Sequence, residues 1–315
     1  MENTTMENTR TKTTRNSLIL LLTAAIWGMA FVSQSKGMDY MHPFAFSGVR
    51  SLIGAASILV YILISRKIAG DKAAPLDWKL NVKAGLLCGI FLTIASTLQQ
   101  FGIKYTSVGK AGFITTLYII FVPMFGIFLK KKVAPVVWAA AVMAAVGMYL
   151  LCMTESLRLG AGDIMVFLCA IAFAIQIMTV DHYAARIDGA VVSCIQFTVC
   201  GVVCCIGALI WGQPTFGQLQ EGLGALLYAG VLSCGVGYTL QIVGQKGLNP
   251  TVAALIMSLE SVIATISGWI AYKIGFLTTD QTLTARQIAG CVIVFAAVIL
   301  VQLPPEWFRF GKKNA

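Results

Sequence analysis

The stretches QQFGIK (residues 99–104) and QIVGQK (residues 241–246) share a glutamine, a glycine and a lysine at the same spacing, 142 residues apart. The same shift places Gly126 on Gly268 and residues 107–118 on residues 249–260. A shift of 146 places residues 24–31 on residues 170–177, and a shift of 150 places the fifth apolar run on the tenth. The chain therefore consists of two copies of one unit that differ slightly in loop length.

The composition indicates where these copies reside. Hydrophobic residues make up 58% of the 315 residues, charged residues only 11%, and the mean hydropathy is +0.82. This balance predicts an integral membrane protein. Ten apolar runs have about the length, roughly 20 residues, that a helix needs to cross a bilayer. The predicted spans are 17–35, 43–65, 82–103, 108–129, 134–153, 162–183, 189–211, 222–244, 250–273 and 284–303.

We therefore expect an all-α membrane protein of ten transmembrane helices, arranged as two five-helix repeats. The predicted parts are a disordered cytoplasmic tail (1–16), the first repeat (17–153), the second repeat (161–303) and a second cytoplasmic tail (304–315). Because each copy has an odd number of helices, the second copy enters the membrane from the opposite side. The two copies are then related by a pseudo-twofold axis in the membrane plane.

Lysine and arginine are distributed unequally between the two sides. With the N-terminus inside, the inner segments hold sixteen: Arg10, Lys12, Arg15, Arg66, Lys67, Lys72, Lys79, Lys83, Lys130, Lys131, Lys132, Arg186, Lys246, Arg309, Lys312 and Lys313. The outer segments hold six: Lys36, Lys104, Lys110, Arg158, Lys273 and Arg286. This bias predicts a cell-membrane protein with both termini in the cytoplasm. The net charge of +10 then reflects topology and contact with lipid headgroups, and we expect no nucleic-acid partner.

Several segments resemble a known family. They are IWGMAFVSQ (26–34), HPFAFSGVR (42–50), YTSVGKAGFITTLYIIFVP (105–123) and PTVAALIMSLES (250–261). Over roughly residues 17–303 the chain resembles the ten-helix EamA branch of the drug/metabolite transporter superfamily. The resemblance implies transport of a small metabolite or drug, often linked to protons. In that family a proline often follows the glutamate of the ninth helix, whereas Ser261 follows Glu260 here, so we expect a weaker helix break.

Two ionisable residues lie inside the predicted spans, where charge is costly and function is the default hypothesis. Arg50 offers a planar fork of donors that suits a carboxylate or phosphate. Glu260 can exchange a proton, because burial disfavours its charged form, or can bind a substrate ammonium. We expect both to bind a zwitterionic substrate and Glu260 to couple transport to protons. The repeat places Arg50 on Gln196 and Glu260 on Tyr118, so the charge is not symmetric.

Other interpretations of these two charges remain open. Arg50 and Glu260 could pair with each other or with backbone carbonyls, or Arg50 could extend to the outer headgroups.

Uncharged residues complete the predicted substrate site. Side-chain amides in a membrane need hydrogen-bond partners. Gln99, Gln196 and Gln241 carry such amides and are predicted to bind the substrate; hydrogen bonding between helices is their alternative role. Trp27, Tyr118 and Tyr238 could line a cavity and present a polar tip or a cation-binding face; ordinary packing is the alternative. The repeated glycine and lysine of the opening motif are interpreted mainly as a helix end. Asp163 is interpreted as a helix N-cap.

Inverted repeats are typical of alternating-access carriers, so we expect a secondary transporter of a small polar or amphipathic metabolite, with an amino acid or an amine as candidates. The proton is the candidate coupling ion. Alternatives are a multidrug-type exporter or a facilitative, channel-like permease. We expect no enzyme, because both histidines lie near span ends and no Walker A loop is present. The nine cysteines lack histidines at ligand spacing, so we expect no metal and no cofactor.

Overall fold

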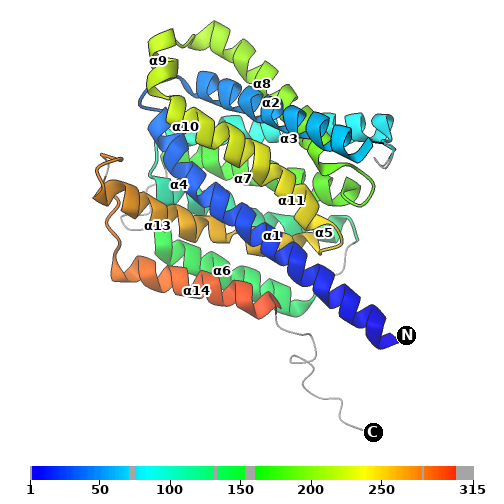
Figure 1. Cartoon of the computed structure of the whole chain (residues 1–315). Helices are drawn as coiled ribbons and strands as arrows, with labels where there is room; N and C mark the ends of the chain where they lie inside the picture. The colour runs from blue at the N-terminus through cyan, green and yellow to red at the C-terminus, as the bar shows by residue number, and fades with distance from the viewer. Residues whose placement is uncertain (1, 71–74, 131–132, 153–159, 279, 303–315) are drawn as a thin grey trace.

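The computed structural model describes residues 2–70, 75–130, 133–152, 160–278 and 280–302, which form a bundle of helices (Figure 1). The elements of the first half are α1 (Glu2–Gly37), α2 (Pro43–Ala69), α3 (Trp78–Ile103), α4 (Val108–Thr116), α5 (Tyr118–Phe128) and α6 (Pro135–Cys152). Those of the second half are α7 (Ala161–Tyr183), α8 (Gly189–Trp211), α9 (Phe216–Glu221), α10 (Leu223–Leu227), the π-helical η2 (Tyr228–Gly237), α11 (Tyr238–Gln245), α12 (Pro250–Met257), α13 (Leu259–Lys273) and α14 (Ala285–Gln302).

The predicted fold class is confirmed. Within the described residues, 8 helical stretches are long and apolar enough to cross a membrane, and two shorter apolar helices, Pro135–Leu150 and Ala285–Val301, complete the ten. The shorter pair corresponds to the fifth and tenth predicted spans. Two of the stretches join two α-helices each, namely Val108–Phe128 and Pro250–Lys273, and a third, Leu223–Gln245, joins α10, η2 and α11. The protein is a multi-pass membrane protein.

Helix starts follow local capping chemistry that recurs in both halves. His42 caps α2 with Pro43 as its first residue, and Asp188 caps α8 at the position 146 residues later. Ser107 caps α4, and Asn249, 142 residues later, caps α12. These side chains accept hydrogen bonds from the free amides of the first helical turn, which stabilises each start. The shifts found in the sequence therefore coincide with matching helix boundaries.

Three spans are interrupted near their middles. At Leu117, between α4 and α5, the amide donates to the Ile114 carbonyl at 3.2 Å, a tighter turn than an α-helix makes. At Ser258, between α12 and α13, a similar turn joins the Ser261 amide to the Ser258 carbonyl at 3.1 Å. The ninth span is thus interrupted although Ser261 is not a proline. The third interruption is η2, and π-helical turns are frequent at functional sites.

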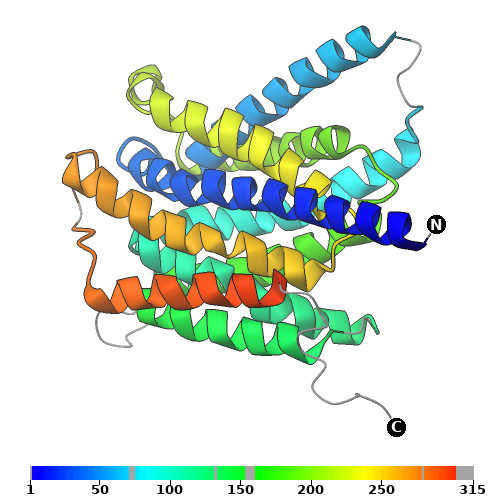
Figure 2. The same ribbon diagram turned by 60° about the horizontal axis from the view of Figure 1, so that its bottom comes forward.

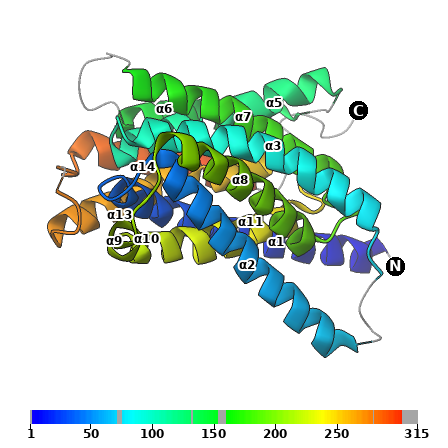
Figure 3. The ribbon, with the colours of Figure 1, turned by 90° about the horizontal axis from the view of Figure 1, so that it is seen from above.

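The two halves interleave instead of packing as separate blocks. α2 packs along α8, and α6 packs along α14 at one edge of the bundle (Figure 2). α1 of the first half packs on α13 of the second, and reciprocally α7 packs on α4 and α5. Seen from above, α2 and α8 lie beside each other and α3 follows α8 on its other side (Figure 3). The centre of the molecule is therefore built from equivalent helices of both halves.

The bundle has two ends that matter for the site. α1 begins and α14 stops at the same end, which we call the termini end; the opposite end, where α1 stops and α2 begins, is the far end (Figure 1). Of the described lysines and arginines, those near the helix ends segregate as predicted. Arg66, Lys67, Lys79, Lys83, Lys130, Arg186 and Lys246 flank the termini end, and Lys36, Lys104, Lys110, Lys273 and Arg286 flank the far end. That the termini end faces the cytoplasm stays a prediction.

The N-terminal segment differs from its prediction as a disordered tail. α1 starts at Glu2 and runs without a break into the first span, because no proline or glycine interrupts residues 2–27. The predicted C-terminal tail, 304–315, and the predicted repeat ends 153 and 303 lie outside the described residues. The repeat boundaries themselves stay predictions.

Candidate functional site

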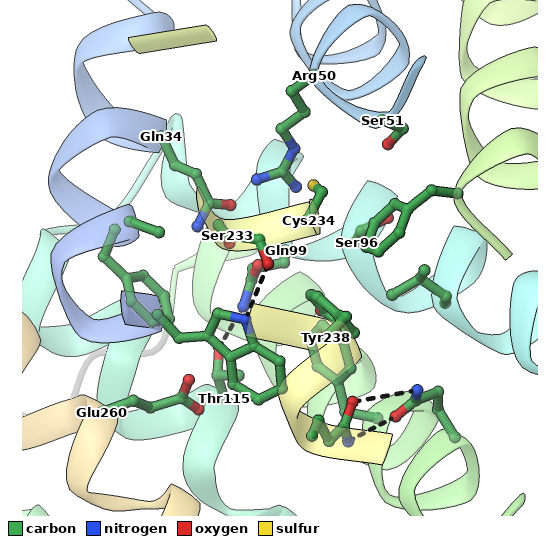
Figure 4. Close-up of a pocket in the computed structure, with 18 of the residues that line it drawn as sticks. Gln34, Arg50, Ser51, Ser96, Gln99, Thr115, Ser233, Cys234, Tyr238 and Glu260 are labelled. Carbon is green, nitrogen blue, oxygen red and sulfur yellow. Dashed lines mark hydrogen bonds between the residues drawn. The ribbon is translucent and has the colours of Figure 1, made fainter. Parts of the chain in front are cut away.

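A cavity of about 40 Å³ lies at the centre of the molecule, between helices of both halves (Figure 4). A water molecule needs roughly 10–15 Å³ of such space, so the conformation described has room for about three waters. Seven of the eight predicted site residues line this cavity: Trp27, Arg50, Gln99, Tyr118, Tyr238, Gln241 and Glu260. Gln196 does not line it. All of the site residues predicted from the sequence except Gln196 therefore lie at one cavity.

Glu260 and Tyr118 meet directly in the cavity wall. The Tyr118 hydroxyl donates a hydrogen bond of 3.0 Å to Glu260 Oε1, and both side chains are buried. Tyr118 begins α5 and Glu260 is the second residue of α13, so each follows the interruption in its span. Their separation of 142 residues equals the repeat shift. Two equivalent residues thus touch each other, which places this hydrogen bond at the pseudo-twofold axis.

Arg50 reaches the cavity from α2, and none of the described residues forms an ion pair with it. Its side chain is only 5% exposed, so it does not extend to the headgroups. Ion pairs of the described residues join Lys36 to Asp39 and Lys110 to Asp163, and neither involves Arg50 or Glu260. The guanidinium lies 5.5 Å from the centre of the Phe46 ring, and its Nε has no hydrogen-bond partner in the described chain. Figure 4 shows the guanidinium and the Glu260 carboxylate on opposite sides of the lining.

Aromatic rings form one wall of the cavity. The Trp27 and Tyr238 rings lie 4.5 Å apart, and the Phe197 and Tyr238 rings 5.0 Å apart, edge to face. Trp27 Nε1 donates to the Ser233 carbonyl of η2 at 3.4 Å. A Cβ atom at Gly237 would lie 2.6 Å from Trp27 Nε1, so only glycine allows the indole to approach η2 this closely. Trp27 therefore packs closely against η2 and hydrogen-bonds to its backbone.

The glutamines divide into paired and unpaired groups. Gln176 and Gln241 exchange amide hydrogen bonds of 3.5 and 3.2 Å across α7 and α11, and Gln99 donates to Thr115 Oγ1 at 3.2 Å. These bonds are the interhelical role that the sequence left open, and the same side chains also line the cavity. Gln196 is fully buried on α8, and neither its Nε2 nor its Oε1 has a partner in the described chain.

The glycines of the opening motif sit at close helix contacts. A Cβ at Gly102 would lie 2.8 Å from the Gly162 carbonyl oxygen, and one at Gly244 would lie 2.7 Å from Leu20. Both positions are near the ends of α3 and α11. The motif therefore combines a packing role for glycine with a cavity position for the glutamine.

Most of the lining follows the repeat. Eight pairs of equivalent positions both line the cavity: Trp27/Phe173, Ala30/Gln176, Phe31/Ile177 and Ser51/Phe197 at the 146 shift, and Leu92/Cys234, Ser96/Tyr238, Gln99/Gln241 and Tyr118/Glu260 at the 142 shift. The sequence choice missed Ser51, Ser96, Thr115, Ser233 and Cys234. A serine or threonine in an apolar helix gives little indication of a functional role in the sequence. The repeat, however, would have identified Ser96 as the equivalent of the predicted site residue Tyr238.

Comparisons with known proteins give the class of protein. The sequence model of the EamA-like transporter family matches residues 15–153 and again residues 160–303. The chain therefore belongs to the EamA-like transporter family and is a membrane transport protein. The duplicated match agrees with the two copies identified from the shifts.

Two relatives of this chain are known as uncharacterized transporters. An uncharacterized transporter of Archaeoglobus fulgidus is 27% identical over 290 residues, covering 90% of this chain and 84% of that protein. The uncharacterized transporter YwfM of Bacillus subtilis is 25% identical over 294 residues, covering 92% and 94%. A solved crystal structure superimposes with a TM-score of 0.72 at 16% identity, covering 94% of this chain and 99% of the other, which shows a shared fold.

Proposed function

We propose that this protein is a secondary transporter that moves a small polar or amphipathic metabolite across the cell membrane by alternating access, with both termini in the cytoplasm. An amino acid is the first candidate substrate and an amine the second. Glu260 is the proposed proton-coupling residue, and no cofactor is needed. Arg50, Glu260, Trp27, Tyr118, Gln99, Gln241 and Tyr238 form the proposed substrate site, and Gln196 joins it in another conformation.

One observation carries this proposal: Arg50 lines a buried cavity without an ion pair among the described residues. An unpaired cation in a low-dielectric interior is costly, and its fork of donors matches a carboxylate. A carboxylate-bearing ligand would therefore complete the site.

The opposite side of the cavity suits the other end of such a ligand. Glu260 is buried there, and its Oε1 already accepts from Tyr118. A ligand ammonium would be attracted by this carboxylate and by the faces of Trp27 and Tyr238. In the absence of an ammonium, uptake of a proton would neutralise Glu260. Substrate and proton would thus compete for the same carboxylate, which is a simple basis for coupled transport.

Alternating access is supported by the position of the cavity and by the interruptions around it. The cavity lies where equivalent helices of the two halves meet, as expected of inverted-repeat carriers. Leu117 and Ser258 interrupt the two spans that bear Tyr118 and Glu260, so each span can bend beside the site. The small present volume indicates a closed conformation that must widen to admit a metabolite.

A multidrug-type exporter is the second candidate, favoured by the ring-rich wall of Trp27, Phe31, Phe173, Phe197 and Tyr238. A facilitative, channel-like permease is the third. Counterflow in proteoliposomes separates the carrier from the channel, because only a carrier accumulates labelled substrate against its gradient by exchange.

Thermal stabilisation tests the site directly. We expect one chemical class in a panel of amino acids, amines, nucleosides, sugars and organic acids to raise the melting temperature, because a ligand that binds only the folded state stabilises it. The shift should disappear in Arg50→Gln and remain in Asp39→Asn, whose carboxylate is exposed at the far end. A hit that survives Arg50→Gln would contradict the proposed site.

Proton coupling has its own test. We expect Glu260→Gln to fold and insert but to transport the identified substrate with no dependence on pH, since the amide cannot exchange a proton. Flux in proteoliposomes at several pH values measures this, with Asp39→Asn as the control. Unchanged pH dependence in Glu260→Gln would reject the role.

A further inference from the structure

The lining of the cavity departs from the repeat at three positions outside η2. Gln34, Arg50 and Thr115 line the cavity, whereas their equivalents Val180, Gln196 and Met257 do not. Residues of η2 are left out of this comparison because its wider turns disturb the one-to-one correspondence with α3.

The three exceptions lie toward one end. Gln34 is three residues from the far-end terminus of α1, and Arg50 and Thr115 are seven residues, about two turns, from the far-end starts of α2 and α4. Their equivalents Val180, Gln196 and Met257 lie at the same distances from the ends of α7, α8 and α12 that are located at the termini end. The cavity therefore extends from the pseudo-twofold axis toward the far end, and the positions that would extend it toward the termini end are closed.

Gln196 gives independent support that these closed positions belong to a second conformation. Its side-chain nitrogen and oxygen are both buried, and neither has a partner in the described chain. A buried amide left unpaired destabilises the conformation that contains it. Its neighbours do not compensate: the Ser193 hydroxyl, one turn earlier on α8, also lacks a partner in the described chain.

From these observations we infer that Gln196 and Arg50 exchange places: when the cavity opens toward the termini end, Gln196 lines it and Arg50 leaves it. This inference rests on the proposed function, because inverted repeats reach the opposite-facing state by exchanging their conformations. The site then offers a ligand a charged guanidinium on one side of the membrane and a neutral amide on the other. Gln196 is thus a specificity-determining residue of the termini-facing state.

Site-resolved cysteine labelling of the full chain tests the exchange. The probe is the membrane-impermeant anion 2-sulfonatoethyl methanethiosulfonate, added to membrane vesicles of either orientation. Mass spectrometry reads each introduced cysteine separately, so the native cysteines stay in place. Labelling of the exposed position Asp39→Cys shows that the reagent has access to the far end, and labelling of Lys79→Cys shows that it has access to the termini end. No assumption about the cytoplasmic side is needed.

We expect Gln196→Cys and Met257→Cys to react at least about 10-fold faster from the termini end than from the far end. Thr115→Cys should show the reverse preference. Val192→Cys is the matched control, since it lies one turn from Gln196, is fully buried, and is equivalent to Phe46, which is also buried and outside the lining. It should react slowly from both ends.

Two failures are distinguishable. If Met257→Cys reacts from the termini end but Gln196→Cys is as slow as Val192→Cys, the exchange is overturned and alternating access stands. If neither Met257→Cys nor Gln196→Cys reacts from the termini end, alternating access itself fails.

Gln196→Leu is a second test that needs no reactive cysteine at position 196. Removing an unpaired buried amide should raise the melting temperature by roughly 2 °C or more. It should also slow termini-end labelling of Met257→Cys by about 5-fold, because the closed conformation gains stability. A lower melting temperature would mean that the amide is satisfied in the resting structure, and would overturn the inference.

Discussion

The far end and the termini end of the bundle are built from equivalent helix starts, yet they are held closed by different chemistry. At the far end, Lys110 of α4 pairs with Asp163 of α7 at 2.6 Å, which joins the first half to the second. The repeat shifts place Lys110 on Val252 and Asp163 on Ser17 at the termini end, and neither of these residues carries a charge. At these equivalent positions of the described residues, an ion pair therefore joins the two halves at the far end but not at the termini end.

The surroundings of the ion pair make the contrast larger. Asp163 is only 4% exposed, and it also accepts hydrogen bonds from the Thr106 hydroxyl at 2.9 Å and the Gly160 amide at 2.8 Å. At the termini end, the Asn16 amide donates to the Lys246 carbonyl at 2.7 Å, a neutral bond between the two halves. The repeats therefore give both ends the same backbone geometry, while individual side chains set how firmly the two halves are joined at each end.

The largest effect is expected when the buried ion pair is broken. Asp163→Asn keeps the size of the side chain but leaves the Lys110 ammonium, which is 21% exposed, without its partner. Removing one member of a buried pair costs about 3 kcal/mol or more, so we expect a loss of this order in the free energy of unfolding. Denaturation in mixed detergent micelles measures it, and labelling of Thr115→Cys from the far end should become faster.

The double variant Lys110→Met/Asp163→Asn is the matched control. With both charges removed, most of the lost stability should return, since the cost arises from an uncompensated charge. If the double variant is as unstable as Asp163→Asn, then Asp163 acts mainly through Thr106 and Gly160, and the ionic view of the far end is wrong.

A smaller effect is expected at the termini end. Asn16→Ala removes one neutral hydrogen bond, and the Oδ1 atom of Asn16 has no partner in the described chain, so about 1 kcal/mol should be lost. Asn81→Ala at the same end removes two bonds, one from its amide to the Asp77 carbonyl and one from the Asp188 amide, and should cost about twice as much. The same denaturation measurement ranks the two variants. A loss in Asn16→Ala equal to that of Asp163→Asn would erase the contrast between the ends.

The sequence predicted the frame better than its interruptions. Apolar run lengths place nine of the predicted helix starts close to those of the structure; the exception is α1, which begins at Glu2. The interruption at Leu117 and the π-helical η2 were not predicted, because the apolar pattern continues through them; at Ser258 the family resemblance gave only the expectation of a weak break beside Glu260. They depend on how helices cross, which a periodic pattern does not encode.

The candidate site shows the same division. Arg50 and Glu260 were identified as site residues because a charged side chain inside a membrane is energetically costly. Gln99 and Gln241 were identified because the repeat matches them. Asp163 is not the N-cap residue of α7, which is Gly160; it is the third residue of the helix, and its carboxylate accepts from the Gly160 amide and so caps the same helix start. The carboxylate also pairs with Lys110, 53 residues earlier. The contact between Lys110 and Asp163 depends on tertiary packing, and the sequence around either residue does not indicate the other.

The smallest effect is expected for a second ion pair at the far end, and it isolates the role of burial. Lys36 and Asp39 lie 2.9 Å apart, with side chains 20% and 54% exposed, and they join the last turn of α1 to the turn that follows it instead of joining the two halves. Water screens such a pair, so Asp39→Asn should change the free energy of unfolding by less than about 0.5 kcal/mol, and added salt should remove even that. The same substitution type at the same end then differs from Asp163→Asn in burial, in what the pair joins and in the two further hydrogen bonds that Asp163 accepts. A large loss in Asp39→Asn would mean that charge at the far end matters wherever it lies, and that the stability of this end does not depend mainly on Lys110 and Asp163.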